Sequence, residues 1–201
     1  GIEADESLGL TLFSMTMTEA AQYMMDKFDL MNVKEFRERL VSRLGEHAGI
    51  DEIAVFFGEE MAESMRPFYK EEAVPRKGAL ELLETFDKVG IPMTIATSTH
   101  SDLLEPALER LGIAKYFKTL ISASALAISK STPVPFEMCL DAMGLEAGSD
   151  IWVFEDGLYA IKTVKEMGLS AVGIYDEISK DDWEDIREIA DVHVKELDEL
   201  I

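Results

Sequence analysis

From residue 75 onward, short apolar runs alternate with helical segments, and this alternation limits the possible folds more than any other feature of the sequence. Strands are expected over residues 92–96, 119–122, 151–154, 171–174 and 191–194, and helices over 79–89, 101–111, 135–143, 158–167 and 181–189. Strands that alternate with helices imply right-handed crossovers and a parallel sheet. We therefore expect an α/β core with a doubly wound, Rossmann-like parallel sheet.

The part of the chain before residue 75 shows helical periodicity only. Thr16 and Glu19 form a capping-box pattern ahead of the first expected helix, and Asn32 and Glu35 form the same pattern ahead of the second. A third helix is expected over residues 51–70, interrupted at a glycine and a proline. Methionines recur in these helices at the helical period, which favours core filling over a ligand groove.

A change of pattern near residue 75 suggests a domain boundary. Pro75 disfavours helix at Val74, and Gly78 permits a turn. We expect a small all-helical domain over residues 1–74 and the α/β core over residues 75–201.

Charge and cysteine content exclude several classes of partner. The chain has 40 acidic and 19 basic residues and a net charge of −21, which argues against nucleic acid and anionic membranes. Its single cysteine, Cys139, excludes an internal disulfide and suits a reducing compartment. No apolar run approaches the roughly 18 residues of a membrane span, and no signal-peptide pattern is present. We expect a cytoplasmic protein that acts on a small molecule, as a monomer or a weak homo-oligomer.

An acid pair follows the apolar run at residues 151–154. A run without polar alternation predicts a buried parallel strand, so Glu155 and Asp156 should emerge at the carboxyl edge of the sheet, where ligands bind in open α/β folds. Adjacent carboxylates repel each other unless a hard cation such as Mg²⁺ lies between them and a substrate. The alternative is a solvated turn at a helix N-terminus, where acids are also favoured.

Two other segments carry polar groups that suit an anion. Thr97, Ser98 and Thr99 follow an apolar strand, where hydroxyls and backbone donors can hold a phosphate or carboxylate at the start of a helix. Serine and threonine also cap helices, which is the simpler explanation. Lys130 lies in a proline-stiffened loop; it would neutralise an anion near the acid pair, although a lone lysine is usually solvated.

Together these segments resemble the second, third and fourth motifs of the haloacid dehalogenase (HAD) superfamily, in the branch of phosphoglycolate phosphatase and β-phosphoglucomutase. The matching segments are Thr97-Ser98, the loop from Lys130 to Pro135, and Phe154-Glu155-Asp156-Gly157 followed by Ala160-Ile161-Lys162. The resemblance covers nearly the whole chain and implies that the helical domain is a cap. It implies a Mg²⁺-dependent phosphohydrolase acting on a small phosphorylated metabolite, with a phosphomutase as an alternative.

The resemblance also implies a role for each matching residue. Thr97 would be a catalytic residue that grips the phosphoryl group, with Ser98 beside it as a second substrate-binding residue. Asp156 would be a metal ligand, and Glu155 would bind the metal directly or through water.

The third motif departs from the family pattern. The family reads Lys-Pro-x-Pro where this chain reads Thr132-Pro133-Val134-Pro135. In this register Thr132 takes the lysine position as a substrate-binding residue. Lys130, two residues upstream, is the candidate catalytic lysine if its long side chain reaches the site.

The family's first motif, Asp-x-Asp-Gly-Thr after an apolar strand, is absent from the sequence. That motif supplies the nucleophilic aspartate, and the N-terminal acids Glu3, Asp5 and Glu6 have no strand before them. In the family this strand lies between the strands that end at Thr97 and at the acid pair. We therefore expect that a segment preceding residue 1 has been lost; an improvised strand over residues 8–13 is the alternative.

Two readings of activity follow. The chain as given should be nearly inert as a phosphohydrolase because it lacks the nucleophile. A non-catalytic relative that binds a phosphorylated ligand or a protein partner is the alternative, and the threonine at position 132 supports it.

Overall fold

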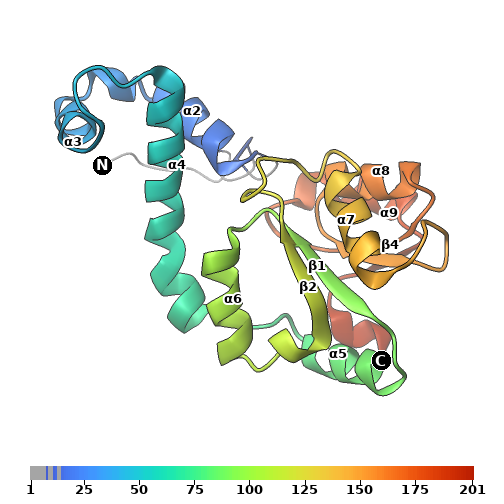
Figure 1. The fold of residues 1–201 in the computed structure, drawn as a ribbon. Coiled ribbons are helices and arrows are strands. Elements are labelled where there is room, and N and C mark those ends of the chain that lie inside the picture. The colour runs from blue at the N-terminus through green and yellow to red at the C-terminus, as the bar shows by residue number, and fades with distance from the viewer. Residues whose placement is uncertain (1–7, 9–10, 13–14) are drawn as a thin grey trace. The chain divides into compact units, whose positions relative to one another are not determined.

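The computed structural model describes residue 8, residues 11–12 and residues 15–201. The chain divides into two compact units, residues 1–67 and 68–201 (Figure 1). The division lies before the expected boundary because the segment Phe68–Glu72, a short π-helix, belongs to the second unit. The Tyr69 hydroxyl hydrogen bonds with that of Thr99 at 3.1 Å, and Arg110 donates to the carbonyl oxygens of Tyr69 and Ala73.

The first unit is helical in its described residues. It contains α2 (Met17–Lys27), the 3₁₀ turn η1 (Leu30–Asn32), α3 (Lys34–Leu44) and α4 (Ile50–Pro67). Its buried core consists of Met25, Leu30, Leu40, Ile53 and Ala54, so the core contains a methionine, as expected. Gly58 does not interrupt α4: a Cβ at this position would lie 3.0 Å from the Met17 carbonyl oxygen, so glycine permits a close approach of α2.

One of the two expected capping boxes is present. Thr16 caps α2: its Oγ1 accepts from the Glu19 backbone N–H at 3.3 Å, and its own N–H donates to the Glu19 carboxylate at 2.8 Å. The expected cap at Asn32 is wrong, since α3 begins after Val33. The Asn32 amide instead donates to Asp29 at 2.9 Å and closes the turn η1, so it is not available to the helix.

The second unit contains the five expected strands and the five expected helices, each within two residues of its expected bounds. The strands are β1 (Met93–Thr97), β2 (Phe117–Ser122), β3 (Trp152–Glu155), β4 (Ser170–Ile174) and β5 (Val192–Val194). The helices are α5 (Ala79–Lys88), α6 (Ser101–Arg110), α7 (Val134–Met143), α8 (Leu158–Glu166) and α9 (Trp183–Ile189), with short 3₁₀ turns η3 (Ala114–Tyr116), η4 (Lys180–Asp182) and η5 (Leu197–Leu200). No described helix is both long enough and apolar enough to cross a membrane.

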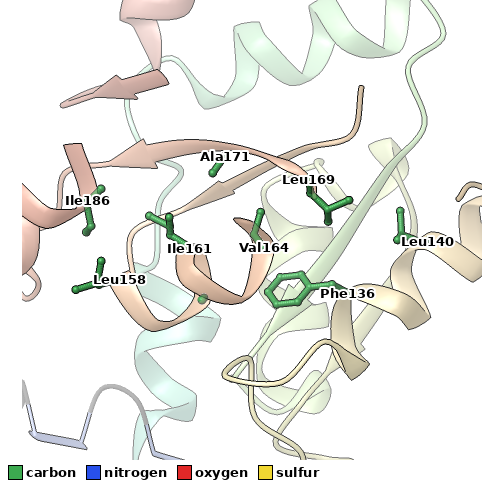
Figure 2. Packing of buried hydrophobic residues seen from close by; sticks show 9 residues of the cluster. Phe136, Leu140, Leu158, Ile161, Val164, Leu169, Ala171 and Ile186 are labelled. Atoms are coloured by element: carbon green, nitrogen blue, oxygen red, sulfur yellow. The ribbon is translucent and has the colours of Figure 1, made fainter. Parts of the chain in front are cut away.

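The strand β4 shows why this unit is doubly wound. Ala171 belongs to a buried cluster with side chains of α7, α8 and α9 (Figure 2). The neighbouring Val172, together with Ile174, packs with Leu82 of α5 and Leu197 of η5. Successive residues of a strand point to opposite faces, so helices cover both faces of the sheet. The expected α/β fold with parallel strands is confirmed.

The strands form two separate sheets in the described part of the chain. β1 pairs with β2, and β3, β4 and β5 form a three-stranded sheet in that order. No described strand pairs with the remaining edge of β1 or of β3. An improvised strand over residues 8–13 is wrong for Leu8, Thr11 and Leu12, which are helical; residues 9, 10 and 13 lie outside the described residues.

Candidate functional site

The end of β1 is a loop of hydroxyl side chains that the neighbouring strand β2 holds in place. Thr97 Oγ1 accepts from the Thr99 backbone N–H at 3.0 Å. From the end of β2, Ser122 Oγ donates to the Thr99 carbonyl oxygen at 2.8 Å, and Ser124 Oγ donates to that of Ser98. A hydroxyl is both donor and acceptor, so Thr97 can still donate its own proton to a bound anion.

At the end of β3, Glu155 is paired with Lys130. The Lys130 Nζ lies 2.8 Å from one carboxylate oxygen and 3.1 Å from the other, and the two residues are only 9% and 8% exposed. The Gly157 backbone N–H donates to the same carboxylate at 3.2 Å. Burial is the largest influence and by itself lowers the pKa of Lys130, but Glu155, Tyr159 and Asp156 together outweigh it and the net pKa is raised. Lys130 is therefore a charged lysine held beside the acid pair.

The position of Lys130 changes the register of the third motif. Matching the motif's lysine to Lys130 puts Pro133 on its second proline, immediately before α7. Thr132 is exposed, and its hydroxyl donates to the Ser129 carbonyl oxygen at 2.8 Å. The register that places Thr132 at the lysine position therefore does not fit the geometry, because the side chain that reaches the acid pair is that of Lys130.

Asp156 lies in a different environment from Glu155. Its carboxylate is 30% exposed and lies 3.6 Å from the guanidinium of Arg76, which also contacts Asp176 and donates to the Tyr175 carbonyl oxygen at 2.9 Å. Burial and then the charge of Glu155 raise the pKa of Asp156 from 3.8 to about 6. The negative charge of Asp156 is thus only partly compensated, and an added cation would stabilise it.

Tyr159 lies in the first turn of α8, where its ring packs against Gly157 beside the carboxylate of Glu155. Burial is the largest influence on the pKa of its hydroxyl and raises it, and Lys130, Glu155, Ser98 and Asp156 also influence it. Groups that follow β1 and β3 therefore both lie near this side chain.

Sequence reasoning missed three residues of this site. Tyr159 carried a usable signal, since side chains in the first turn of a helix lean toward its N-terminus and thus toward the sheet edge. Asp176 also carried a usable signal, because it comes shortly after the apolar strand β4, as Asp156 comes after β3. Arg76 had no local signal: it reaches Asp176 across 100 residues of sequence.

The residues present suit Mg²⁺ as a partly hydrated ion. Among the described side chains, no three of His, Cys, Asp or Glu are grouped to hold a metal. Mg²⁺ commonly keeps several waters and binds through one or two carboxylates plus substrate phosphates. The undercompensated carboxylate of Asp156 fits such an ion, whereas both oxygens of Glu155 already accept from Lys130.

Comparisons with known proteins bear on the family and the fold of the chain. The family described as haloacid dehalogenase-like hydrolase matches residues 11–168. The chain is 33% identical over 128 residues to validoxylamine A 7′-phosphate phosphatase of Streptomyces hygroscopicus subsp. limoneus, covering 64% of this chain and 58% of that protein. It is 27% identical over 119 residues to a phosphoglycolate phosphatase of Neisseria gonorrhoeae, covering 59% and 47%. The chain thus spans about half the length of the curated relatives it matches.

A solved structure shares the fold. The crystal structure of β-phosphoglucomutase from Clostridium difficile matches with a TM-score of 0.65 and 16% identity, covering 100% of this chain and 80% of that one. At this identity the similarity concerns the fold alone.

Proposed function

This chain belongs to the haloacid dehalogenase-like hydrolase family, and from that premise we propose that it is a Mg²⁺-dependent phosphohydrolase of a small phosphorylated metabolite. The observation that carries the proposal is the buried pair of Lys130 and Glu155 beside the only partly compensated carboxylate of Asp156. The names of two relatives, which give a 7′-phosphate of validoxylamine A and phosphoglycolate, support a phosphate monoester as the substrate class.

The chain's own groups would recognise the phosphoryl group from two sides. The ammonium of Lys130 has three N–H donors. The two oxygens of Glu155 accept from two of them, one each, which leaves the third donor for a ligand. The free donor and the hydroxyl of Thr97 would bind phosphoryl oxygens. Charge-assisted hydrogen bonds of this kind are roughly twice as strong as neutral ones.

Asp156 would hold the metal ion. When bound, Mg²⁺ neutralises phosphoryl oxygens and orients the group for in-line attack. The net charge of −21 makes this neutralisation important, because the protein's own field repels an anionic substrate. We also propose that the helical unit, residues 1–67, serves as the cap that selects the substrate and excludes water.

A second candidate is phosphate binding without turnover. Covalent phosphoryl transfer requires a nucleophile, and the nucleophile motif is absent from the sequence. The described residues also leave one edge of β1 and one edge of β3 unpaired. We therefore expect slow or no turnover by residues 1–201, whether the parent reaction is hydrolysis or phosphomutase chemistry.

Binding and turnover can be measured separately on the 201-residue chain. We expect Mg²⁺ with inorganic phosphate to raise the thermal midpoint, since a ligand of the native state stabilises it, and either one alone to do so less. The variant Asp156→Asn should lose this response, and Asp141→Asn, which changes an exposed acid of α7, should keep it. No response of the wild type to Mg²⁺ and phosphate would overturn the proposal.

Phosphate release from p-nitrophenyl phosphate and from phosphoglycolate then measures turnover by the same chain. Release that depends on Mg²⁺ and on Asp156 would show that residues 1–201 act as a hydrolase without the nucleophile motif. Binding with no release is the result expected for residues 1–201.

A further inference from the structure

The segment that connects the two units carries a side chain that reaches the hydroxyl loop after β1. This segment, the π-helix η2 (Phe68–Glu72), follows α4 directly, and the Ala73 backbone N–H donates to the Phe68 carbonyl oxygen at 2.9 Å. The Tyr69 hydroxyl lies 3.1 Å from the Thr99 hydroxyl and forms a partly buried hydrogen bond with it. π-Helical turns are rare and occur frequently at functional sites. The connection between the units thus has a direct contact with the candidate anion site.

Thr99 is fixed by three hydrogen bonds, one of which orients Thr97. Its backbone N–H donates to Thr97 Oγ1 at 3.0 Å, and its carbonyl oxygen accepts from the buried Ser122 at 2.8 Å. Its side chain is held by Tyr69. Because the Thr99 N–H occupies one acceptor position of the Thr97 hydroxyl, the position of Thr99 limits the directions in which Thr97 can donate its proton.

Arg110 holds the turn that carries Tyr69. Its guanidinium donates to the carbonyl oxygens of Tyr69, at 3.4 Å, and of Ala73, at 2.5 Å. Carbonyl groups at the end of a helix lack partners within the helix and need other donors. Arg110 ends α6, and the same helix begins at Ser101, directly after the hydroxyl loop. One helix therefore supports the hydroxyl loop at its start and the connection between the units at its end.

We propose that Tyr69 is a positioning residue of the anion site: through Thr99, it holds the Thr97 hydroxyl in the orientation that binds a phosphoryl oxygen. This inference rests on the proposed function, in which Thr97 is a phosphate ligand. The competing explanation is structural, namely that Tyr69 only attaches η2 to the α/β unit. The two explanations differ in whether loss of the Tyr69 hydroxyl changes phosphate affinity through Thr97.

The variant Tyr69→Phe tests the proposal by calorimetry with inorganic phosphate in the presence of Mg²⁺. A neutral hydrogen bond contributes enough that its loss should weaken phosphate binding about three- to tenfold. The affinity for Mg²⁺ alone should not change, because Asp156 follows a different strand. The matched control is Tyr116→Phe, which removes the hydroxyl of a half-buried tyrosine in η3 and should leave both affinities unchanged.

A double-mutant cycle with Thr97→Val shows whether Tyr69 acts through Thr97. Phosphate binding stays measurable in Thr97→Val, because Lys130 and Mg²⁺ remain. In that background Tyr69→Phe should weaken phosphate binding by less than about twofold, since two residues that act through one contact have non-additive effects. Equal losses in the wild-type and Thr97→Val backgrounds would overturn the proposal.

A second variant, Arg110→Lys, loosens the turn around Tyr69 but keeps both the Tyr69 hydroxyl and the positive charge. Lysine lacks the planar fork with which arginine donates to two carbonyl oxygens. We expect phosphate binding to weaken about two- to fivefold, because the hydrogen bond of Tyr69 with Thr99 is perturbed rather than removed. This variant tests the position of the Tyr69 hydroxyl rather than its presence.

The outcomes distinguish this inference from the proposed function. Wild-type protein that binds no phosphate with Mg²⁺ would overturn both. Full phosphate affinity in Tyr69→Phe would overturn only the role of Tyr69. A loss of phosphate affinity together with Mg²⁺ affinity and thermal midpoint would assign Tyr69 a purely structural role and also overturn it.

Discussion

The ends of β1 and β3 lie at the same site but satisfy their polar groups differently. After β1, the hydroxyls of Thr97 and Thr99 and the carbonyl oxygens of Ser98 and Thr99 hydrogen bond within the chain. After β3, Glu155 is buried and fully paired, whereas Asp156 is more exposed and its charge is only partly balanced by Arg76. The first end is held mainly by hydrogen bonds within the chain, and the second has a charge that a cation would balance.

The physical reason is the different cost of burying hydroxyls and charges. A buried hydroxyl needs only a hydrogen bond, while a buried charge needs an opposite charge as well. The comparison assigns separate tasks to the two acids: Glu155 with Lys130 supports the fold, and Asp156 is the acid available to a cation. The predictions below test that separation, from the largest expected effect to the smallest.

Removing the charge of Lys130 should be the most damaging change. Lys130→Met leaves Glu155 buried without its partner, and losing one member of a buried pair costs about 3–5 kcal/mol of unfolding free energy. Chemical denaturation measures this cost. The double variant Lys130→Met with Glu155→Gln should recover most of the loss, and a single variant as stable as the wild type would contradict the structural role of the pair.

Removing the charge of Asp156 should instead affect the metal. Asp156→Asn should lower Mg²⁺ affinity about 100-fold or more, since losing only an outer partner of a metal ligand already costs roughly 10–100-fold. Titration calorimetry with MgCl₂ measures the affinity, with Asp141→Asn as the charge-matched control. Equal Mg²⁺ affinity in Asp156→Asn and the wild type would remove Asp156 from the site.

The same variant should change how stability depends on pH without metal. The pKa of Asp156 is about 6 in the folded protein and near 3.8 in the unfolded chain. As the pH falls, the folded state therefore binds a proton at a higher pH than the unfolded chain does. Ionised Asp156 therefore lowers the unfolding free energy above pH 6, and this destabilisation disappears toward pH 4. Asp156→Asn should be more stable than the wild type at pH 7.5, by on the order of 1–3 kcal/mol, and the difference should vanish near pH 4. Equal stabilisation by Asp156→Asn at both pH values would show that the effect does not come from the raised pKa of Asp156.

Removing the hydroxyl of Thr97 should have a smaller effect. Thr97→Val takes away the acceptor for the Thr99 backbone N–H, which costs about 1 kcal/mol of unfolding free energy. It should also weaken phosphate binding, because the hydroxyl is a proposed ligand. Denaturation and phosphate titration measure the two effects, and unchanged phosphate affinity would exclude Thr97 from the anion site.

Thr132→Val should have the smallest effect. The Thr132 hydroxyl is exposed and contacts the Ser129 carbonyl oxygen, so its loss should change stability by no more than about 0.5 kcal/mol, as at other surface positions. Phosphate affinity should not change if Lys130 fills the lysine position of the third motif. A clear loss of phosphate affinity would restore the register that begins at Thr132.

Local pattern predicted most of the α/β unit but less of the detail in the helical unit. Apolar runs and helix-ending glycines predicted the strands and helices from β1 to β5. The pattern at Asn32 was wrong because its side chain serves the turn before α3, and Gly58 was misread because its close contact with Met17 is not local. Such contacts depend on which elements pack together.

The sequence alone determined that Thr97, Ser98, Glu155 and Asp156 come at the carboxyl ends of parallel strands, because the periods of strands and helices are local properties. Only the tertiary structure decided that Lys130 pairs with Glu155, 25 residues away, and that Arg76 lies beside Asp156. Ion pairs and hydrogen bonds between distant segments arise from side-chain reach and burial after packing. These are the properties that make one of two adjacent acids structural and leave the other to a ligand.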